Sequence, residues 1–166
     1  MGRDGDEHIE AVERAMVALR RSQSRRTLAR LAARQPAGSG GDRGTAATAA
    51  SGGGVEVLDA VEEAEEAVRP ATVTSVAIAL GIDQPRASKL VAAAVTAGLV
   101  RREADQADGR RALLVRTPAG RRLSAEVHAF RRQVADQAMA DWPVGDRAEF
   151  ARLLTRFVES LGAVTR

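Results

Sequence analysis

The stretch that decides the fold is TSVAIALGIDQPRASKLVAAAVTAGLV, residues 74–100. Residues 74–80 have apolar side chains at helical spacing, and Gly81 follows them where a sharp turn between two helices needs a glycine. Asp83 can cap a second helix over residues 84–97, Pro85 suits its first turn, and Gly98 can end it. The pattern predicts a helix-turn-helix.

A short β-hairpin is expected directly after this unit. Residues 99–102 are β-like, residues 104–109 form a polar and flexible tip, and residues 112–116 make a second strand. Thr117 followed by Pro118 is typical of a helix start, so a long helix is expected from there to about Asp141. A hairpin in this position is called a wing.

Helices and one linker are expected on either side. Residues 6–34 follow an amphipathic pattern, and Val55–Val68 reads as an acidic helix with Val57, Leu58, Val61 and Ala64 inward. Asp146 with Glu149 resembles a capping box at the start of the last helix. The expected divisions are a dimerisation helix over 1–35, a flexible Gly-rich linker over 36–54, a DNA-binding domain over 55–116, and C-terminal helices over 117–166 that complete the dimerisation region.

Composition excludes several kinds of chemistry. The 166 residues include no cysteine and only two histidines, His8 and His128, so thiol chemistry is absent and we expect neither a metal nor a cofactor. We also expect no enzyme activity, because no His–carboxylate set or phosphate-binding glycine motif is evident. No apolar run is long enough to span a membrane, which predicts a cytoplasmic protein.

Apolar stripes lie near both ends of the chain. The first comprises Ile9, Val12, Met16 and Leu19, and the second comprises Phe150, Leu153, Leu154, Phe157 and Leu161. One small winged unit cannot cover both stripes, so we expect a two-fold homodimer. The alternative is that both stripes pack within one monomer.

Five segments in order resemble the MarR family of winged-helix bacterial transcription regulators. They are residues 76–81 (VAIALG), 86–91 (RASKLV), 98–102 (GLVRR), 108–111 (DGRR) and 117–120 (TPAG). The resemblance covers about residues 70–125 without a gap, whereas the Gly-rich linker departs from the usual compact connection. It implies a mainly α fold with a β-hairpin wing, flanked by long dimerisation helices.

Candidate DNA contacts fall on the second helix and the wing. The start of a recognition helix enters the major groove, which points to Gln84, Arg86, Ser88 and Lys89. Arg86 and Lys89 are candidates either for base contacts or for phosphate contacts only. By the resemblance, Arg110 enters the minor groove and Asp108 pairs with an arginine to hold the wing.

Two further arginines complete the expected interface. Arg111 adds a phosphate or groove contact, and Arg101 is either a phosphate clamp or an ion-pair partner of Glu103 or Asp105. The resulting hypothesis is a homodimeric, sequence-specific regulator of double-stranded DNA, in the role of a repressor, that responds to a small-molecule effector of unknown identity. The alternative is a winged-helix protein–protein module without DNA binding. Such a module predicts neutral or acidic residues at positions 86, 89 and 110, whereas the sequence has Arg86, Lys89 and Arg110 there.

Overall fold

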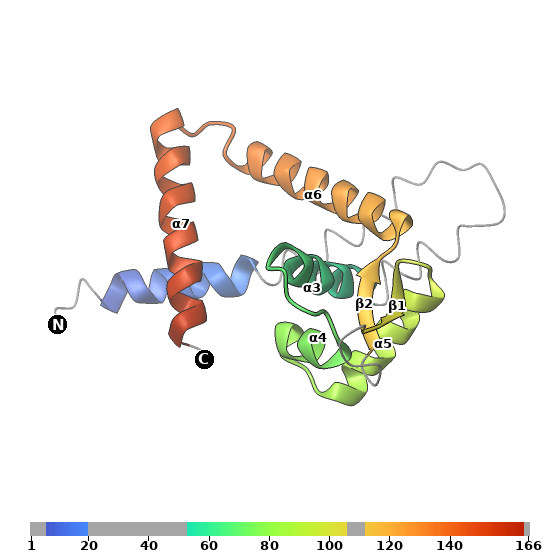
Figure 1. Ribbon diagram of the computed structural model, residues 1–166. Coiled ribbons are helices and arrows are strands. Elements are labelled where there is room, and N and C mark those ends of the chain that lie inside the picture. The colour runs from blue at the N-terminus through green and yellow to red at the C-terminus, as the bar shows by residue number, and fades with distance from the viewer. Residues whose placement is uncertain (1–5, 20–52, 106–111, 165–166) are drawn as a thin grey trace. The chain divides into compact units, whose positions relative to one another are not determined.

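The computed structural model describes residues 6–19, 53–105 and 112–164 (Figure 1). Residues 6–19 are helical. The remaining elements are α3 (Gly54–Glu66), α4 (Val73–Leu80), α5 (Gln84–Thr96), β1 (Val100–Ala104), β2 (Ala112–Arg116), α6 (Pro118–Ala138) and α7 (Val144–Val164). The prediction of a mainly helical fold with one β-hairpin is confirmed. None of the helices within these described ranges is long and apolar enough to cross a membrane.

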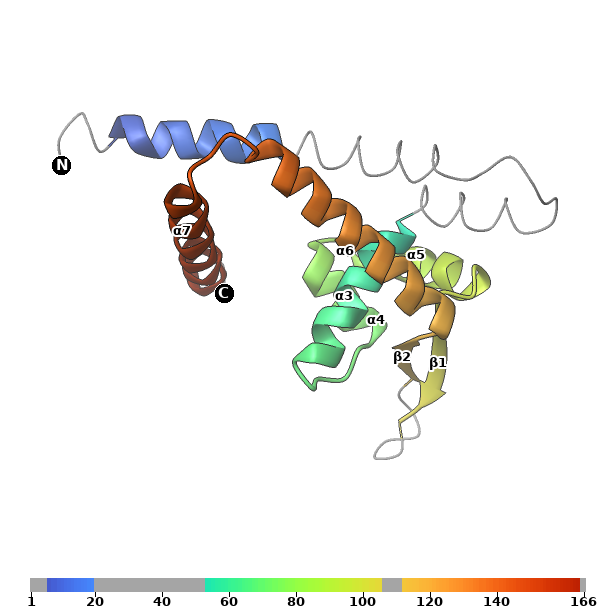
Figure 2. The same ribbon diagram turned by 90° about the horizontal axis from the view of Figure 1, so that it is seen from above.

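The chain divides into two compact units, the first ending at His128 and the second beginning at Ala129. In the first unit, α3, α4, α5 and the hairpin enclose one core (Figure 2). The largest fully buried side chains of this core are Leu58, Val57, Val61, Val76, Val91 and Val100. The predicted inward face of α3 is therefore correct.

The helix-turn-helix forms from local capping interactions. Thr72 caps α4, because its side chain accepts a hydrogen bond from the Ser75 backbone N–H and the Ser75 side chain accepts one in return from the Thr72 N–H. Asp83 caps α5 as predicted, accepting from the Arg86 N–H at 2.8 Å. Gly81 lies between the helices with φ 61°, in the left-handed region that favours glycine. The helix boundaries differ from the expected ones by one residue, since α4 begins at Val73 and α5 ends at Thr96.

The hairpin is antiparallel, with Val100 paired to Arg116 and Ala104 to Ala112. β2 has the predicted bounds, whereas β1 begins one residue later and ends two residues later than expected. Leu99 is buried just before β1, and its backbone carbonyl accepts from the Thr117 N–H at 3.0 Å. This contact joins the two ends of the hairpin.

The segment TPAG at residues 117–120 holds the start of α6 against the hairpin. The Thr117 hydroxyl donates to the Gly98 carbonyl at 2.6 Å and accepts from the Gly120 N–H at 3.0 Å. Gly120 packs so closely that an added Cβ would lie 2.1 Å from the Leu99 carbonyl oxygen. The motif therefore has a packing role, since only glycine permits this approach.

The last two helices differ from the predicted boundaries. α6 ends at Ala138 rather than near Asp141. α7 begins at Val144, so Asp146 lies in its first turn rather than at its cap, and Glu149 pairs with Arg152 instead of closing a capping box. The expectation of a capping box at Asp146 was wrong, because the chain becomes helical directly after Pro143, a residue well suited to the boundary of a helix. Trp142, between α6 and α7, packs edge-on against Phe150.

Candidate nucleic-acid interface

The helix α5 has one buried side and one exposed side. Ala87, Val91 and Ala94 are buried and attach α5 to the core. The predicted contact residues Gln84, Arg86, Ser88 and Lys89 are all exposed. The fold thus places the four candidate side chains on the outward side of the helix, near its N-terminus.

Gln84 is held by the preceding helix. Its side-chain amide nitrogen donates to the Thr74 hydroxyl at 3.0 Å. An amide nitrogen has two hydrogens, so one donor and the carbonyl oxygen remain for another partner. The hydrogen bond from Gln84 to Thr74 was not predicted from the sequence. The two residues are ten positions apart on different helices, and only the turn between the helices brings them together.

Arg86 and Lys89 present uncompensated positive charge. Neither side chain forms an ion pair with another residue of the described ranges, and both are exposed. The N-terminus of a helix carries partial positive charge, so it attracts anions and repels cations. Two cationic side chains within the first turns of α5 add to this positive charge, and the helix start therefore favours an anionic partner. The arrangement is suited to contacts with phosphates or with guanine edges.

The wing is described only at its base. Arg101 pairs with Glu103 on the same strand, with 2.5 Å between Nη1 and Oε1, so the ion-pair interpretation of Arg101 is the one observed. Both side chains remain about half exposed, and a pair of this kind is weak enough to exchange partners. Asp108, Arg110 and Arg111 lie outside the described residues.

A charged network, not foreseen from the sequence, connects β2 to α3. The buried Arg116 guanidinium contacts Glu62 and also bonds Glu65 at 2.8 Å. His128 on α6 lies 2.7 Å from the second carboxylate oxygen of Glu62. Burial favours a raised pKa for Glu62, but the hydrogen bonds from His128 and Arg116, together with their charges, outweigh it and hold the pKa below its usual value.

Arg116 responds to the same contacts. Burial would lower the pKa of its guanidinium, but hydrogen bonds to Glu62 and Glu65 and their negative charges raise it instead. Strand alternation could have indicated that Arg116 is buried, because Leu114 and Arg116 share the inward face of β2, but it could not have identified the partners of Arg116. Glu62 and Glu65 are spaced to lie on one side of α3.

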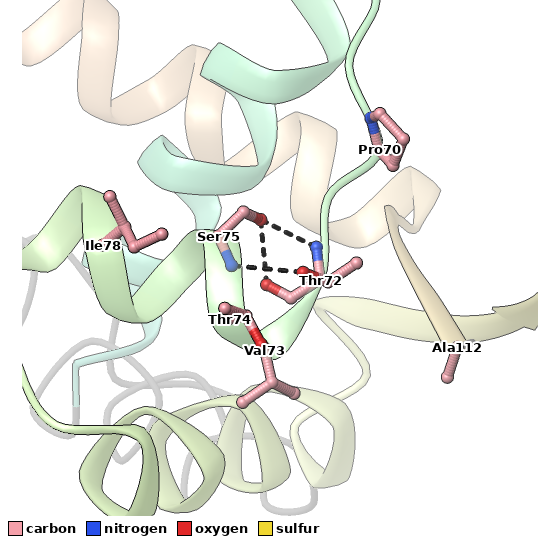
Figure 3. Close-up of a pocket in the computed structure, with 7 residues that line it drawn as sticks. All are labelled: Pro70, Thr72, Val73, Thr74, Ser75, Ile78 and Ala112. Carbon is pink, nitrogen blue, oxygen red and sulfur yellow. Dashed lines mark hydrogen bonds between the residues drawn. The ribbon is translucent and has the colours of Figure 1, made fainter. Parts of the chain in front are cut away.

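A shallow hollow lies beside the N-terminus of α4 (Figure 3). Thr72 and Ser75, which form the capping box, line it together with Pro70, Ile78 and Ala112. The dashed lines in the close-up show that the polar groups of Thr72 and Ser75 bond to each other. The hollow is therefore a feature of the helix start, and its polar groups have partners within the chain.

This combination of two capped helices, an outward basic helix start and a following hairpin defines a winged helix-turn-helix protein. Comparison with known proteins finds the same fold and one family whose profile matches part of the chain. The sequence profile of the MarR family matches residues 55–111, which run from α3 through β1 and stop just before β2. Over this segment, which is less than half of the chain, the sequence is similar to the MarR family, and its fold is that of solved MarR family structures.

Three solved structures illustrate the similarity. A MarR family protein from Bacillus stearothermophilus superposes with a TM-score of 0.71 at 15% identity, covering 98% of this chain and 99% of that chain. The transcriptional regulator BldR from Sulfolobus solfataricus gives 0.61 at 19% identity, with 94% and 99% covered. S. aureus MepR bound to ethidium bromide gives 0.53 at 15% identity, with 89% and 94% covered. No protein of curated function matches the sequence.

Proposed function

We propose that the protein is a homodimeric, sequence-specific DNA-binding transcription regulator that acts as a repressor. The observation that carries the proposal is the outward start of α5, where Arg86 and Lys89 are exposed without an ion-pair partner among the described residues. The back of the same helix is packed into the core through Ala87 and Val91. A recognition helix inserts its N-terminal residues into the major groove, so it needs exposed basic side chains there and a packed opposite face, as α5 has.

The two cations have different roles in this proposal. Arg86 lies in the first turn of α5, so it reaches a base edge, where a guanidinium can bond guanine O6 and N7 together. Lys89 lies about one turn further along, and its flexible point charge suits a phosphate. Gln84, steadied by Thr74, and Ser88 add polar contacts beside them.

The wing supplies the second group of contacts. Arg110 enters the minor groove and Asp108 supports the shape of the wing, in line with the family resemblance. Arg111 and Arg101 contact the phosphate backbone of the DNA. For this contact Arg101 has to give up its ion pair with Glu103 when DNA binds. Because the ion pair is half exposed and contributes little free energy, breaking it lowers the affinity for DNA only slightly.

Dimerisation rests on the exposed apolar stripes. In the single chain, Phe150, Leu153 and Phe157 on α7 are each about two-fifths exposed, and no residue of α7 is buried. Residues 6–19 expose a second stripe that includes Val12 and Met16. Burial of these side chains in a two-fold dimer sets two copies of α5 at successive half-sites of a pseudo-palindromic operator. A small-molecule effector of this dimer is also proposed, since the structurally similar MepR binds ethidium.

A mobility-shift series tests the DNA-binding proposal. The probe is the DNA upstream of the protein's own gene together with single-base variants of the bound site, each at two salt concentrations. We expect Arg86→Ala to remove the preference at one base pair per half-site, at a cost of about 1–3 kcal/mol on the preferred site. Lys89→Ala should weaken binding to every probe alike and lower the salt slope by about one unit.

Arg132→Ala on the exposed face of α6 is the matched control, and it should leave both readouts unchanged. A uniform loss of affinity with Arg86→Ala would show that Arg86 only contacts phosphate. Absence of any shift at low salt would contradict DNA binding and favour a protein–protein module.

A further inference from the structure

Three groups with metal-ligating atoms meet between α3 and α6. They are Asp59 and Glu62 on α3 and His128 on α6, and one ligand atom from each lies within 4.8 Å of the other two. Asp59 and Glu62 are three residues apart, which places them on one side of the helix. His128 Nε2 already lies 2.7 Å from Glu62 Oε2. The spacing is close to that of a coordination shell, since ligands of a tetrahedral zinc ion with bonds near 2.0 Å lie about 3.3 Å apart.

The surroundings orient one of these ligands. Arg116 binds one oxygen of Glu62, and Glu65 binds the same guanidinium, so the other oxygen of Glu62 is directed to His128. A neighbour that fixes the orientation of a ligand in this way is the usual support of a metal site. All three ligand residues are partly buried, which limits the motion of their side chains without closing them off from solvent.

The charge of the cluster favours a divalent cation. Asp59, Glu62 and Glu65 carry three negative charges when ionised, and Arg116 supplies one positive charge, while His128 coordinates a metal in its neutral form. The two carboxylate ligands therefore direct negative charge toward a cation at this point. An imidazole and two carboxylates are the ligands that suit zinc and its neighbours, whereas magnesium prefers oxygen ligands and retained water.

We propose that Asp59, Glu62 and His128 bind a divalent transition-metal ion of the zinc type. The ion replaces the hydrogen bond between His128 and Glu62 and connects α6 to α3. Solvent supplies the fourth ligand, because three protein ligands leave one position of a tetrahedron open. This proposal is independent of DNA binding, and its test uses the protein alone.

Zinc binding is measured by calorimetry on the full chain after chelator treatment and dialysis, with zinc chloride as the only added ligand and excess magnesium in the buffer. We expect one zinc ion per chain and a rise in the melting temperature, because the ion binds only the folded arrangement. Asp59→Asn and His128→Gln should each weaken binding at least tenfold. The chain offers a matched control, His8→Gln, since His8 is the only other histidine and no cysteine is present.

Two outcomes would overturn the proposal. One is the absence of saturable zinc binding to the wild-type chain, in which case the cluster is an ion-pair network only. The other is an unchanged zinc affinity in His128→Gln, which would assign any binding to surface carboxylates. Circular dichroism of each variant at 222 nm checks that the helices are intact, and since Asp59→Asn and His128→Gln change different helices, agreement between them excludes a local folding defect.

Discussion

The winged unit buries its apolar side chains, whereas α7 leaves its apolar side chains exposed. In the winged unit, Leu58 and Val91 are almost fully buried among side chains from α3, α4, α5 and β1. On α7, Leu153 and Phe157 remain about two-fifths exposed, and the helix has no buried residue. The winged unit therefore has a complete core of its own, whereas α7 leaves an apolar face exposed in the single chain, and the proposed dimer would bury that face.

Substitution of one leucine in each region gives the largest expected contrast. Leu58→Ala leaves a cavity in a closed core, which should lower the free energy of unfolding by about 2–5 kcal/mol. Leu153→Ala should change the unfolding of the winged unit little and should raise the dissociation constant of the dimer. Urea unfolding followed by circular dichroism measures the first effect, and sedimentation over a concentration series measures the second. A monomeric wild-type protein at micromolar concentration would contradict the assignment of α7 to a dimer interface.

Two glycines extend the comparison to backbone packing. Gly120→Ala places a Cβ against the Leu99 carbonyl oxygen, an atom that cannot move without disturbing the hairpin. We expect a loss of about 3 kcal/mol. Gly145→Ala on α7 meets nothing within 4 Å and should change stability by no more than about 1 kcal/mol. Equal effects of the two substitutions in urea unfolding would contradict the close approach at Gly120.

The sequence was sufficient for the parts of this structure that depend on local interactions. Asp83 as a cap, the turn at Gly81 and the inward face of α3 all follow from spacing along one segment, and all are confirmed. The network around Arg116 joins residues 51 or more positions apart, so no local pattern contains it. The same holds for Gln84 and Thr74. The assignments of Asp108, Arg110 and Arg111 remain predictions, because these residues lie outside the described part of the chain.

The acidic side chains of the two regions should respond differently to pH. The pKa of folded Glu62 is lowered, so its contacts stabilise the protein above the pKa of the unfolded chain, near 4.5, and this contribution is lost as the pH falls below that value. Glu62→Gln should therefore cost about 1.5 kcal/mol at pH 7 and less at pH 3.5.

The matched control for this effect is Glu149→Gln. Its pKa is also lowered, through a hydrogen bond from Arg152, but both side chains are more than half exposed on α7 and solvent screens the pair. Urea midpoints at the two pH values give the comparison. A destabilisation by Glu62→Gln that grows as the pH falls would contradict the assigned sign.

Helix ends in the winged unit offer the smallest expected effect and the finest comparison. α3 and α5 end with the same hydrogen bonds, in which Arg69 N–H donates to Ala64 and Leu99 N–H donates to Ala94. This motif needs a left-handed residue just past the helix. At the end of α5 that residue is Gly98, with φ 67°, whereas at the end of α3 it is Val68, with φ 51°.

The two positions should therefore respond to substitution with opposite sign. Val68 is 92% exposed, so its side chain contributes no packing that a substitution could remove. A left-handed conformation raises the free energy of a folded residue with a Cβ by about 1–2 kcal/mol. Glycine avoids this cost, but it loses more conformational entropy on folding, which cancels part of the gain in stability. We expect Val68→Gly to stabilise the protein by up to about 1 kcal/mol and Gly98→Ala, which meets no neighbouring atom, to destabilise it by a similar amount. Val68→Ala, which keeps the Cβ, separates this explanation from relief of the branched side chain: if it stabilises as much as Val68→Gly, the backbone conformation is not the cause.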